Sequence, residues 1–189
     1  MSDDHMLALG RDQMIALLSE LGSRLDEQGV QARLFVVGGA AMALAFNSRR
    51  LTADIDGVFE PKAKVYEAAD QMAHAHGLPP DWLNDGVKGL LPGPDPEARV
   101  LLDVPGLSLS VPSPRYLLAL KVASARFDRD LDDIKILADA CGARDAEQVL
   151  QIAEEVMGEG NLPRKSQFAV MELFPPGPVN PERPTTGSG

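Results

Sequence analysis

The segment "GGAAMALAFNSRRLTADIDGVF", residues 38–59, decides the fold of this chain. It is preceded by a short apolar run, "ARLFVV" (residues 32–37), which predicts a strand closed by the glycine pair Gly38-Gly39. The run "AAMALAF" predicts a buried helix that begins directly after the glycines, and "LTADIDGVF" (residues 51–59) predicts a second strand. Strand, glycine pair, helix and strand therefore form the unit around which the remaining elements are arranged.

Helical patterns flank this unit on both sides. Apolar spacing and end signals predict helices over residues 11–29, 61–77, 115–127 (opened by Ser113-Pro114), 128–142 and 146–158 (opened by a capping box of Asp145 and Gln148). Between them, residues 78–98 are rich in Pro and Gly and predict a loop with at most a short helix, and residues 99–112 predict one or two strands.

This order of elements predicts an α+β fold, a small mixed sheet with helices followed by a helical C-terminal half. With 189 residues the chain is long enough for one domain with a real core. We expect a core with its N-terminal helix over residues 1–110, a helical subdomain over 111–174 and a disordered tail over 175–189, where Pro and Gly accumulate.

Composition narrows the class of protein. The net charge of −10 and the isoelectric point near 4.7 argue against a basic protein that coats nucleic acid nonspecifically. The single Cys141 cannot form an internal disulfide, which favours a reducing compartment. The N-terminus lacks the pattern of a signal peptide and no stretch is apolar enough to span a membrane, so we expect a cytoplasmic protein with no membrane partner.

Asp54 and Asp56 stand two residues apart in the second strand. Residues i and i+2 of a strand share a face, at roughly 6–7 Å between Cα atoms, so the two carboxylates repel each other unless a cation lies between them. Mg²⁺ prefers oxygen ligands and often takes one or two carboxylates plus substrate phosphates. For the spacing alone, a solvated strand face is the commoner explanation, and the metal site needs further support.

Gly38 and Gly39 supply that support. A strand, two glycines and a helix place free backbone N–H groups at a helix N-terminus, which favours phosphate. Alone, the pair is more often a plain tight turn, and it is neither a P-loop nor a dinucleotide fingerprint. Together with the aspartates, however, it predicts a site where phosphates and Mg²⁺ are held against each other.

The segment resembles the glycine-pair and D-I-D signature of minimal nucleotidyltransferases of the polymerase-beta superfamily, and most of all the AbiEii group with its MenT-type toxins. "LPPDWLNDGVKGL" (residues 78–90) and "LLALKVASARFDRDLDDIKIL" (residues 117–137) resemble two further blocks of that group, in the same order. The likeness covers roughly residues 34–140.

The resemblance implies a role for each matching residue. Asp54 and Asp56 would ligate Mg²⁺, with an NTP as substrate. The nucleotide would be bound by Gly38, Gly39, Arg50, Thr52, Lys121 and Arg126.

Lys121 stands in an otherwise apolar helix and is expected to contact the triphosphate. Asp133 is expected to orient or activate the attacking hydroxyl, with Asp130 and Asp132 as competitors for that place. Asp103 is an alternative third carboxylate, on the strand that follows.

The same resemblance implies a toxin of a toxin–antitoxin pair that transfers NMP to a tRNA 3′ end and blocks translation, with a cognate antitoxin as partner. The net charge weighs against an RNA acceptor, although a local basic cluster is compatible with it; its candidates are Arg49, Arg50, Lys121, Arg126 and Arg129. Two alternatives stay open: AMP transfer to a protein partner, and a catalytically inert binding or antitoxin-like module.

Overall fold

The computed structural model describes residues 8–47, 49–124 and 126–175. In this part of the chain a five-stranded mixed sheet has the order β3-β2-β1-β5-β4. The strands are β1 (Ala32–Val36), β2 (Ile55–Glu60), β3 (Leu83–Asn84), β4 (Arg99–Val104) and β5 (Leu107–Val111). The pairs β1–β2 and β4–β5 are antiparallel, and the pairs β1–β5 and β2–β3 are parallel.

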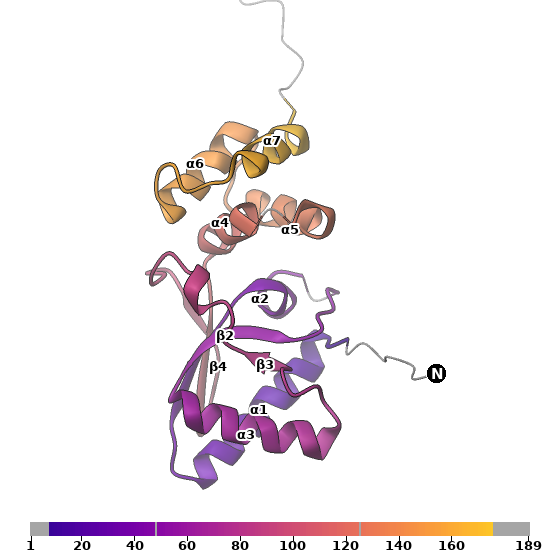
Figure 1. The fold of residues 1–189 in the computed structure, drawn as a ribbon, viewed down its shortest axis with the longest axis vertical. Helices are drawn as coiled ribbons and strands as arrows, with labels where there is room; N and C mark the ends of the chain where they lie inside the picture. The colour runs from indigo at the N-terminus through magenta and orange to yellow at the C-terminus, as the bar shows by residue number, and fades with distance from the viewer. Residues whose placement is uncertain (1–7, 48, 125, 176–189) are drawn as a thin grey trace, which may run out of the picture.

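The helices divide into two groups, as Figure 1 shows. Helices α1 (Arg11–Glu27) and α3 (Lys62–His76) pack against each other and against β5 and β2, and α2 (Gly38–Ala45) lies where the sheet meets the later helices. We call these elements and the sheet the sheet half. Helices α4 (Pro114–Ser124), α5 (Phe127–Ala140), α6 (Ala146–Met157) and α7 (Arg164–Leu173) form the helical half, in which α4 packs against the other three.

Alternation of burial explains the sheet. Along β1, Ala32, Leu34 and Val36 are buried while Arg33 is exposed, as expected for a strand with one face on a core. The buried residues of α1 recur at helical spacing (Met14, Leu18, Leu21, Gly22, Leu25) and complete that core from the side.

Trp82 fixes the loop that follows α3. Its side chain is fully buried, and the indole Nε1–H donates to the carbonyl of Ala69 at 3.0 Å. Its own carbonyl accepts from Ile55 N–H at 2.7 Å, so this loop anchors the first residue of β2.

The expected α+β class is confirmed, and several boundaries differ from the prediction. The strand expected from residue 51 begins only at Ile55, because Leu51–Asp54 make a turn whose single ladder contact is an isolated bridge from Thr52 to Leu9. Helix α2 begins at Gly38 rather than after the glycines, and α4 ends at Ser124 rather than at residue 127.

Two elements were not expected. The two-residue β3 lies in the predicted loop, which also contains the 3-10 helix η1 (Lys88–Leu90), and α7 follows the last helix that was predicted. Beyond Pro175, the predicted disordered tail lies outside the described residues. Within those residues, no helix combines the length and apolar character needed to cross a lipid bilayer.

Candidate functional site

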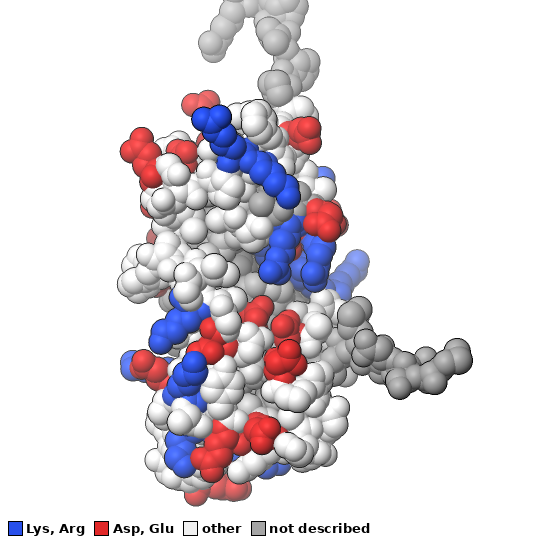
Figure 2. Space-filling model, in the orientation of Figure 1, with Lys and Arg blue, Asp and Glu red and all other residues white. Residues whose placement is uncertain are grey.

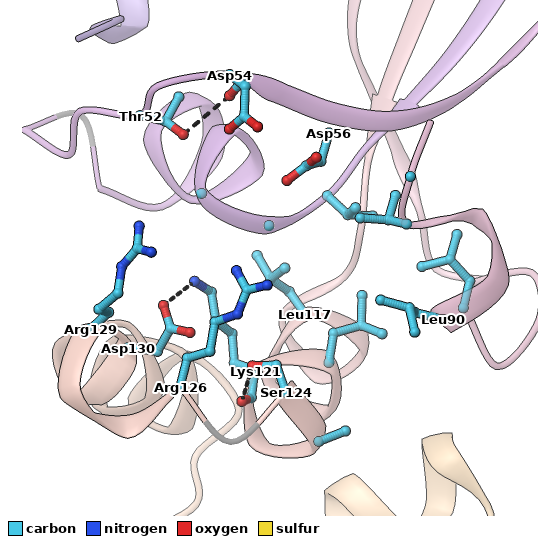
Figure 3. A pocket seen from close by; sticks show the side chains of 18 of the residues that line it. Thr52, Asp54, Asp56, Leu90, Leu117, Lys121, Ser124, Arg126, Arg129 and Asp130 are labelled. Atoms are coloured by element: carbon cyan, nitrogen blue, oxygen red, sulfur yellow. Dashed lines mark hydrogen bonds and ion pairs between the residues drawn. The ribbon is translucent and has the colours of Figure 1, made fainter. Parts of the chain in front are cut away.

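A cavity of about 940 Å³ lies between the sheet half and the helical half (Figure 3). The residues that the resemblance assigns to the metal ion and the nucleotide all line it, whereas Asp133 and the alternative candidates Asp103 and Asp132 do not. Its charged and polar side chains are those of Arg50, Thr52, Asp54, Asp56, Lys121, Ser124, Arg126, Arg129, Asp130 and Asn161. In Figure 2, Lys and Arg side chains gather above the hollow, on the helical half, and Asp and Glu side chains gather below it. Opposite charges therefore face each other across the cavity.

The N-terminus of α2 forms part of the cavity wall. Its N-cap residue, Val37, makes no side-chain cap, and no acidic residue stands in the first turn, so the first backbone N–H groups keep their capacity to donate. Gly38 has φ of 65°, a conformation that favours glycine. A Cβ on Gly39 would stand 3.0 Å from Thr52 Oγ1. The glycine pair thus keeps this helix end bare and close to Thr52, as a phosphate site requires.

Asp54 and Asp56 face this helix end from the start of β2, and both side chains point into the cavity (Figure 3). Asp54 stands one residue before the strand, in the turn, and its carbonyl accepts a hydrogen bond from Thr52 Oγ1 at 3.1 Å. The carbonyl of Asp56 accepts from Val37 N–H at 2.9 Å, which ties β2 to the residue before the glycines. Backbone contacts therefore hold two like-charged carboxylates beside the bare helix end.

The electrostatic state of Asp54 reflects this crowding. Its pKa is raised above the ordinary value, chiefly because burial disfavours the charged form and further because Asp56 and Asp81 add negative charge. A hydrogen bond donated by Asn84 Nδ2 at 3.4 Å and the positive charge of Arg126 oppose that rise. The surroundings leave the negative charge of the pair only partly compensated.

The two carboxylates suit a hard cation. Among the described residues, no group of three His, Cys, Asp or Glu side chains is placed to hold a metal ion. Mg²⁺ in nucleotide sites is commonly held by one or two carboxylates, with phosphate oxygens and water completing the shell. Oxygen donors with partly uncompensated charge, next to a helix end that favours phosphate, fit that arrangement.

A buried ion cluster crosses from the sheet half to the helical half, and it contains Arg50, Lys121, Asp130 and Asp133. Lys121 Nζ lies 2.6 Å from Asp130 Oδ1 and 2.8 Å from Asp133 Oδ2. Arg50 Nη1 lies 2.7 Å from Asp133 Oδ2, and Arg50 Nη2 lies 3.5 Å from Asp130 Oδ1. Asp133 is 1% exposed and is not among the residues that line the cavity. The competitor Asp130 does line the cavity, and Asp132 is exposed.

Arg126 and Arg129 supply the remaining positive charge of the cavity. Both are exposed, and both rise from the start of α5 toward the Asp54–Asp56 side (Figure 3). No ion pair joins either guanidinium to a carboxylate in the described part of the chain. Arg126 was expected at the site, and Arg129 was named only as a candidate for a basic cluster. Arg49, from the same set of candidates, is exposed and does not line the cavity.

The other end of the cavity is apolar, and this feature was not predicted from the sequence. Val87, Leu90 and Leu91, in and beside η1, lie across from Leu117 and Leu120 of α4. Leu90 is 69% exposed, so its apolar surface is open to a ligand in the cavity. Three apolar residues within five positions of a Pro- and Gly-rich loop were the signal that could have revealed this wall.

Asp103 lies apart from the cavity. It is exposed on β4 and pairs in register with Ser108 of β5, which in turn pairs with Arg33 near the start of β1. The cavity lies beyond the opposite end of β1, at Val37. The structure therefore brings together Asp54 and Asp56 but separates Asp103 from them by most of the length of the sheet.

Comparison with known families gives one match, and it agrees with this arrangement. A family described as "nucleotidyltransferase of unknown function (DUF6036)" matches residues 12–161, which include every residue that lines the cavity except Ala8 and Pro163. No curated protein and no solved structure matches the chain. Because the match spans far more than half of the chain, from α1 through α6, the protein belongs to this family of nucleotidyltransferases.

Proposed function

We propose that the protein transfers a nucleoside monophosphate from an NTP to an acceptor hydroxyl and releases pyrophosphate, with Mg²⁺ held by Asp54 and Asp56. One observation carries the proposal: a carboxylate pair whose charge is only partly compensated and a bare helix N-terminus share one cavity with the basic side chains of the opposite wall. This combination suits a triphosphate with its metal ion, because each group on the ligand finds a complementary charge.

The cavity orients the nucleotide by its two ends. The triphosphate lies at the charged end, where Gly38 and Gly39 offer backbone N–H groups. The nucleoside lies at the apolar end, between Leu90 and Leu120, whose surfaces exclude water from a base. Arg126 and Arg129 stand on the open side, where they can meet the phosphate that is transferred or an anionic acceptor.

The chain contributes mainly position and charge. Bound Mg²⁺ would neutralise phosphate charge and orient the leaving pyrophosphate. Asp54 and Asp56 would hold the ion, and the α2 N-terminus would bind phosphate oxygens through backbone N–H groups that need no reorganisation. Arg126 would neutralise charge that develops on the phosphate, since its guanidinium points into the same space.

The finer function rests on the resemblance to the AbiEii group and its MenT-type toxins. We propose a tRNA 3′ end as the acceptor and a cognate antitoxin as the partner, and Arg126 and Arg129 support an anionic acceptor. The net charge of −10 favours the second candidate, AMP transfer to a protein side chain. The presence of Asp54, Asp56 and Lys121 in one cavity argues against a catalytically inert module, because the resemblance assigns these residues to the metal ion and the triphosphate.

Labelling separates these candidates. The protein is incubated with each α-³²P-labelled NTP, Mg²⁺, and either total tRNA or lysate protein, with Asp54→Ala as the control. Label on tRNA supports the first acceptor, and label on a protein band supports the second. Absence of label from both, for wild type and Asp54→Ala alike, would contradict nucleotidyl transfer. Growth arrest on expression that Asp54→Ala relieves would support the toxin role, and arrest that the variant leaves unchanged would contradict it.

Leu90→Ala tests the orientation of the nucleotide. Leu90 is exposed, so the change removes apolar surface from the cavity without a cavity in the core. We expect NTP binding to weaken about fivefold and tripolyphosphate binding to stay unchanged, measured by calorimetry with Mg²⁺. Val100→Ala is the matched control, because Val100 is 62% exposed and lies outside the cavity. Equal weakening of both ligands by Leu90→Ala would overturn the orientation.

A further inference from the structure

The buried ion cluster is asymmetric with respect to the cavity. Asp130 and Asp133 stand one turn apart on α5, and each contacts both Lys121 and Arg50. Asp130 lies in the first turn of the helix and lines the cavity, whereas Asp133 is 1% exposed and lies outside the lining. Asp130 therefore stands on the cavity side of the two cations and Asp133 stands behind them.

The charges of the cluster cancel, and this has a consequence for an incoming triphosphate. Two cations and two carboxylates sum to zero, so the charges of Lys121 and Arg50 are already neutralised in this structure. Asp130 also places negative charge on the same cavity as Asp54 and Asp56. A polyanion that approaches the glycine pair therefore finds the nearest buried cations occupied by Asp130 and Asp133.

Arg50 has an unused donor on the side of the helix end. Its Nε is buried and has no hydrogen-bond partner among the described residues. It lies 3.5 Å from the position that a Cβ on Gly39 would take, so this donor lies beside the N-terminus of α2. An oxygen bound at that helix end would therefore lie near both Arg50 and the backbone N–H groups.

We infer that the Asp130 carboxylate pairs with Lys121 and Arg50 only until the triphosphate of the nucleotide displaces it. Asp133 is then a positioning residue, which holds the same two cations from the side away from the cavity. The inference rests on the proposed function, since it names how that site accepts its nucleotide. On displacement the Asp130 carboxylate turns toward Arg126, four residues earlier on the same helix start, and the phosphates take its place on Lys121.

The inference predicts opposite effects for one chemical change at two neighbouring residues. In Asp130→Asn the competing charge is gone while Asp133 still anchors the cations, so Mg²⁺–tripolyphosphate and NTPs bind about tenfold tighter. In Asp133→Asn the cations lose their anchor, so both ligands bind more weakly. Asp132→Asn is the matched control, because Asp132 lies between Asp130 and Asp133 on the same helix and is exposed. The affinity of this variant for both ligands should stay at the wild-type value.

Calorimetry of the full chain with tripolyphosphate and Mg²⁺ measures these affinities, and initial rates add a second readout. For Asp130→Asn we expect KM for the NTP to fall by the same factor while kcat does not rise. A carboxylate with a purely structural role would leave binding unchanged or weaken it when removed. Affinity of Asp130→Asn equal to or below that of wild type would overturn the inference.

A measurement on the wild type keeps the test independent of how well the variant folds. The ¹³Cγ resonance of Asp130 is followed by NMR while tripolyphosphate and Mg²⁺ are added. We expect this resonance to shift as Asp130 leaves Lys121, while the resonance of Asp132 stays in place. An unchanged Asp130 resonance in protein that binds the ligand would overturn the inference but leave the proposed function intact. If the wild type binds neither tripolyphosphate nor any NTP, the proposed function falls and the inference with it.

Discussion

Two pairs of aspartates border the same cavity, and their surroundings differ. Asp54 and Asp56 stand in the sheet half with no cation in direct contact among the described residues, and the pKa of Asp54 is raised. Asp130 and Asp133 stand in the helical half, each within ion-pair distance of Lys121 and Arg50. The first pair retains charge that a ligand can use, whereas the charge of the second is matched by the protein itself.

The difference separates two tasks that carboxylates perform in one site. A pair left uncompensated is suited to a metal ion, because binding relieves repulsion that folding has imposed. A carboxylate pair whose charge is fully balanced by cations is suited to hold those cations in place. Removing one buried partner would leave an uncompensated charge in a medium of low dielectric constant, which is costly. Substitutions at the two pairs should therefore affect different properties of the protein.

The largest effect is expected at the uncompensated pair, on activity. Asp56→Asn removes one ligand charge without changing shape, so nucleotide transfer should fall on the order of a thousandfold while the fold is retained. The rate of label transfer measures the loss, and circular dichroism checks the fold. The comparison is Asp103→Asn, which alters an exposed aspartate of the same half outside the cavity and should leave the rate near wild type. A comparable loss from Asp103→Asn would restore Asp103 as a third carboxylate.

The next effect is expected at the matched pair, on stability. Asp133→Asn leaves Lys121 and Arg50 short of one buried counter-ion, and the free energy of unfolding should fall by about 3 kcal/mol. Urea denaturation measures it. Asp132→Asn should change it by less than about 0.5 kcal/mol, because that side chain is exposed. Equal stability of the two variants would show that the cluster does not hold the halves together.

The smallest effect is a gain in stability rather than a loss, and it concerns Asp54. Its pKa is higher in the folded state than the ordinary value of 3.8, so the folded protein holds the proton more tightly than the unfolded chain. Stability is therefore lost as pH rises from 3.8 through the raised pKa, and the cost is present in full above it. Asp54→Asn avoids that cost, and its melting temperature at neutral pH in EDTA should exceed the wild-type value by a few degrees at most.

Two conditions should reduce the gain in melting temperature that Asp54→Asn gives. Lowering the pH toward 3.8 protonates the wild-type carboxyl, and adding Mg²⁺ compensates its charge, so either should narrow the difference in melting temperature. Scanning calorimetry across pH, with and without Mg²⁺, measures both. A variant that melts below wild type in metal-free buffer at neutral pH would indicate that the pair is stabilising by itself.

The sequence predicts the uncompensated pair better than the matched one, for a physical reason. The glycine pair, Asp54 and Asp56 lie within 19 residues of each other, and the chemistry follows from local geometry: a helix end and a strand start. Even there the turn at Leu51–Asp54 was read as strand, because the pairing of Thr52 with Leu9 depends on a distant segment.

The matched pair depends on contacts that no local pattern encodes. Arg50 meets Asp130 across 80 residues of chain, so this partner of Arg50 becomes visible only in the fold. Asp130, Asp132 and Asp133 stand in one acidic run, "DRDLDDI", so the sequence left Asp130 and Asp132 as competitors of Asp133. Helix α7 was not predicted, and only Ser166 and Val170 of it are buried.

The bridge between Leu9 and Thr52 concerns anyone who attaches a tag to this protein. Leu9 N–H donates to the Thr52 carbonyl at 2.7 Å and its carbonyl accepts from Thr52 N–H at 3.1 Å, while Ala8 lines the cavity. A fusion placed directly ahead of Ala8 would thus lie beside the turn that carries Asp54. Its bulk could block the acceptor, and a shift of the turn could displace Asp54 as a metal ligand. An affinity handle joined after Pro175, at the far end of the helical half, avoids that interference.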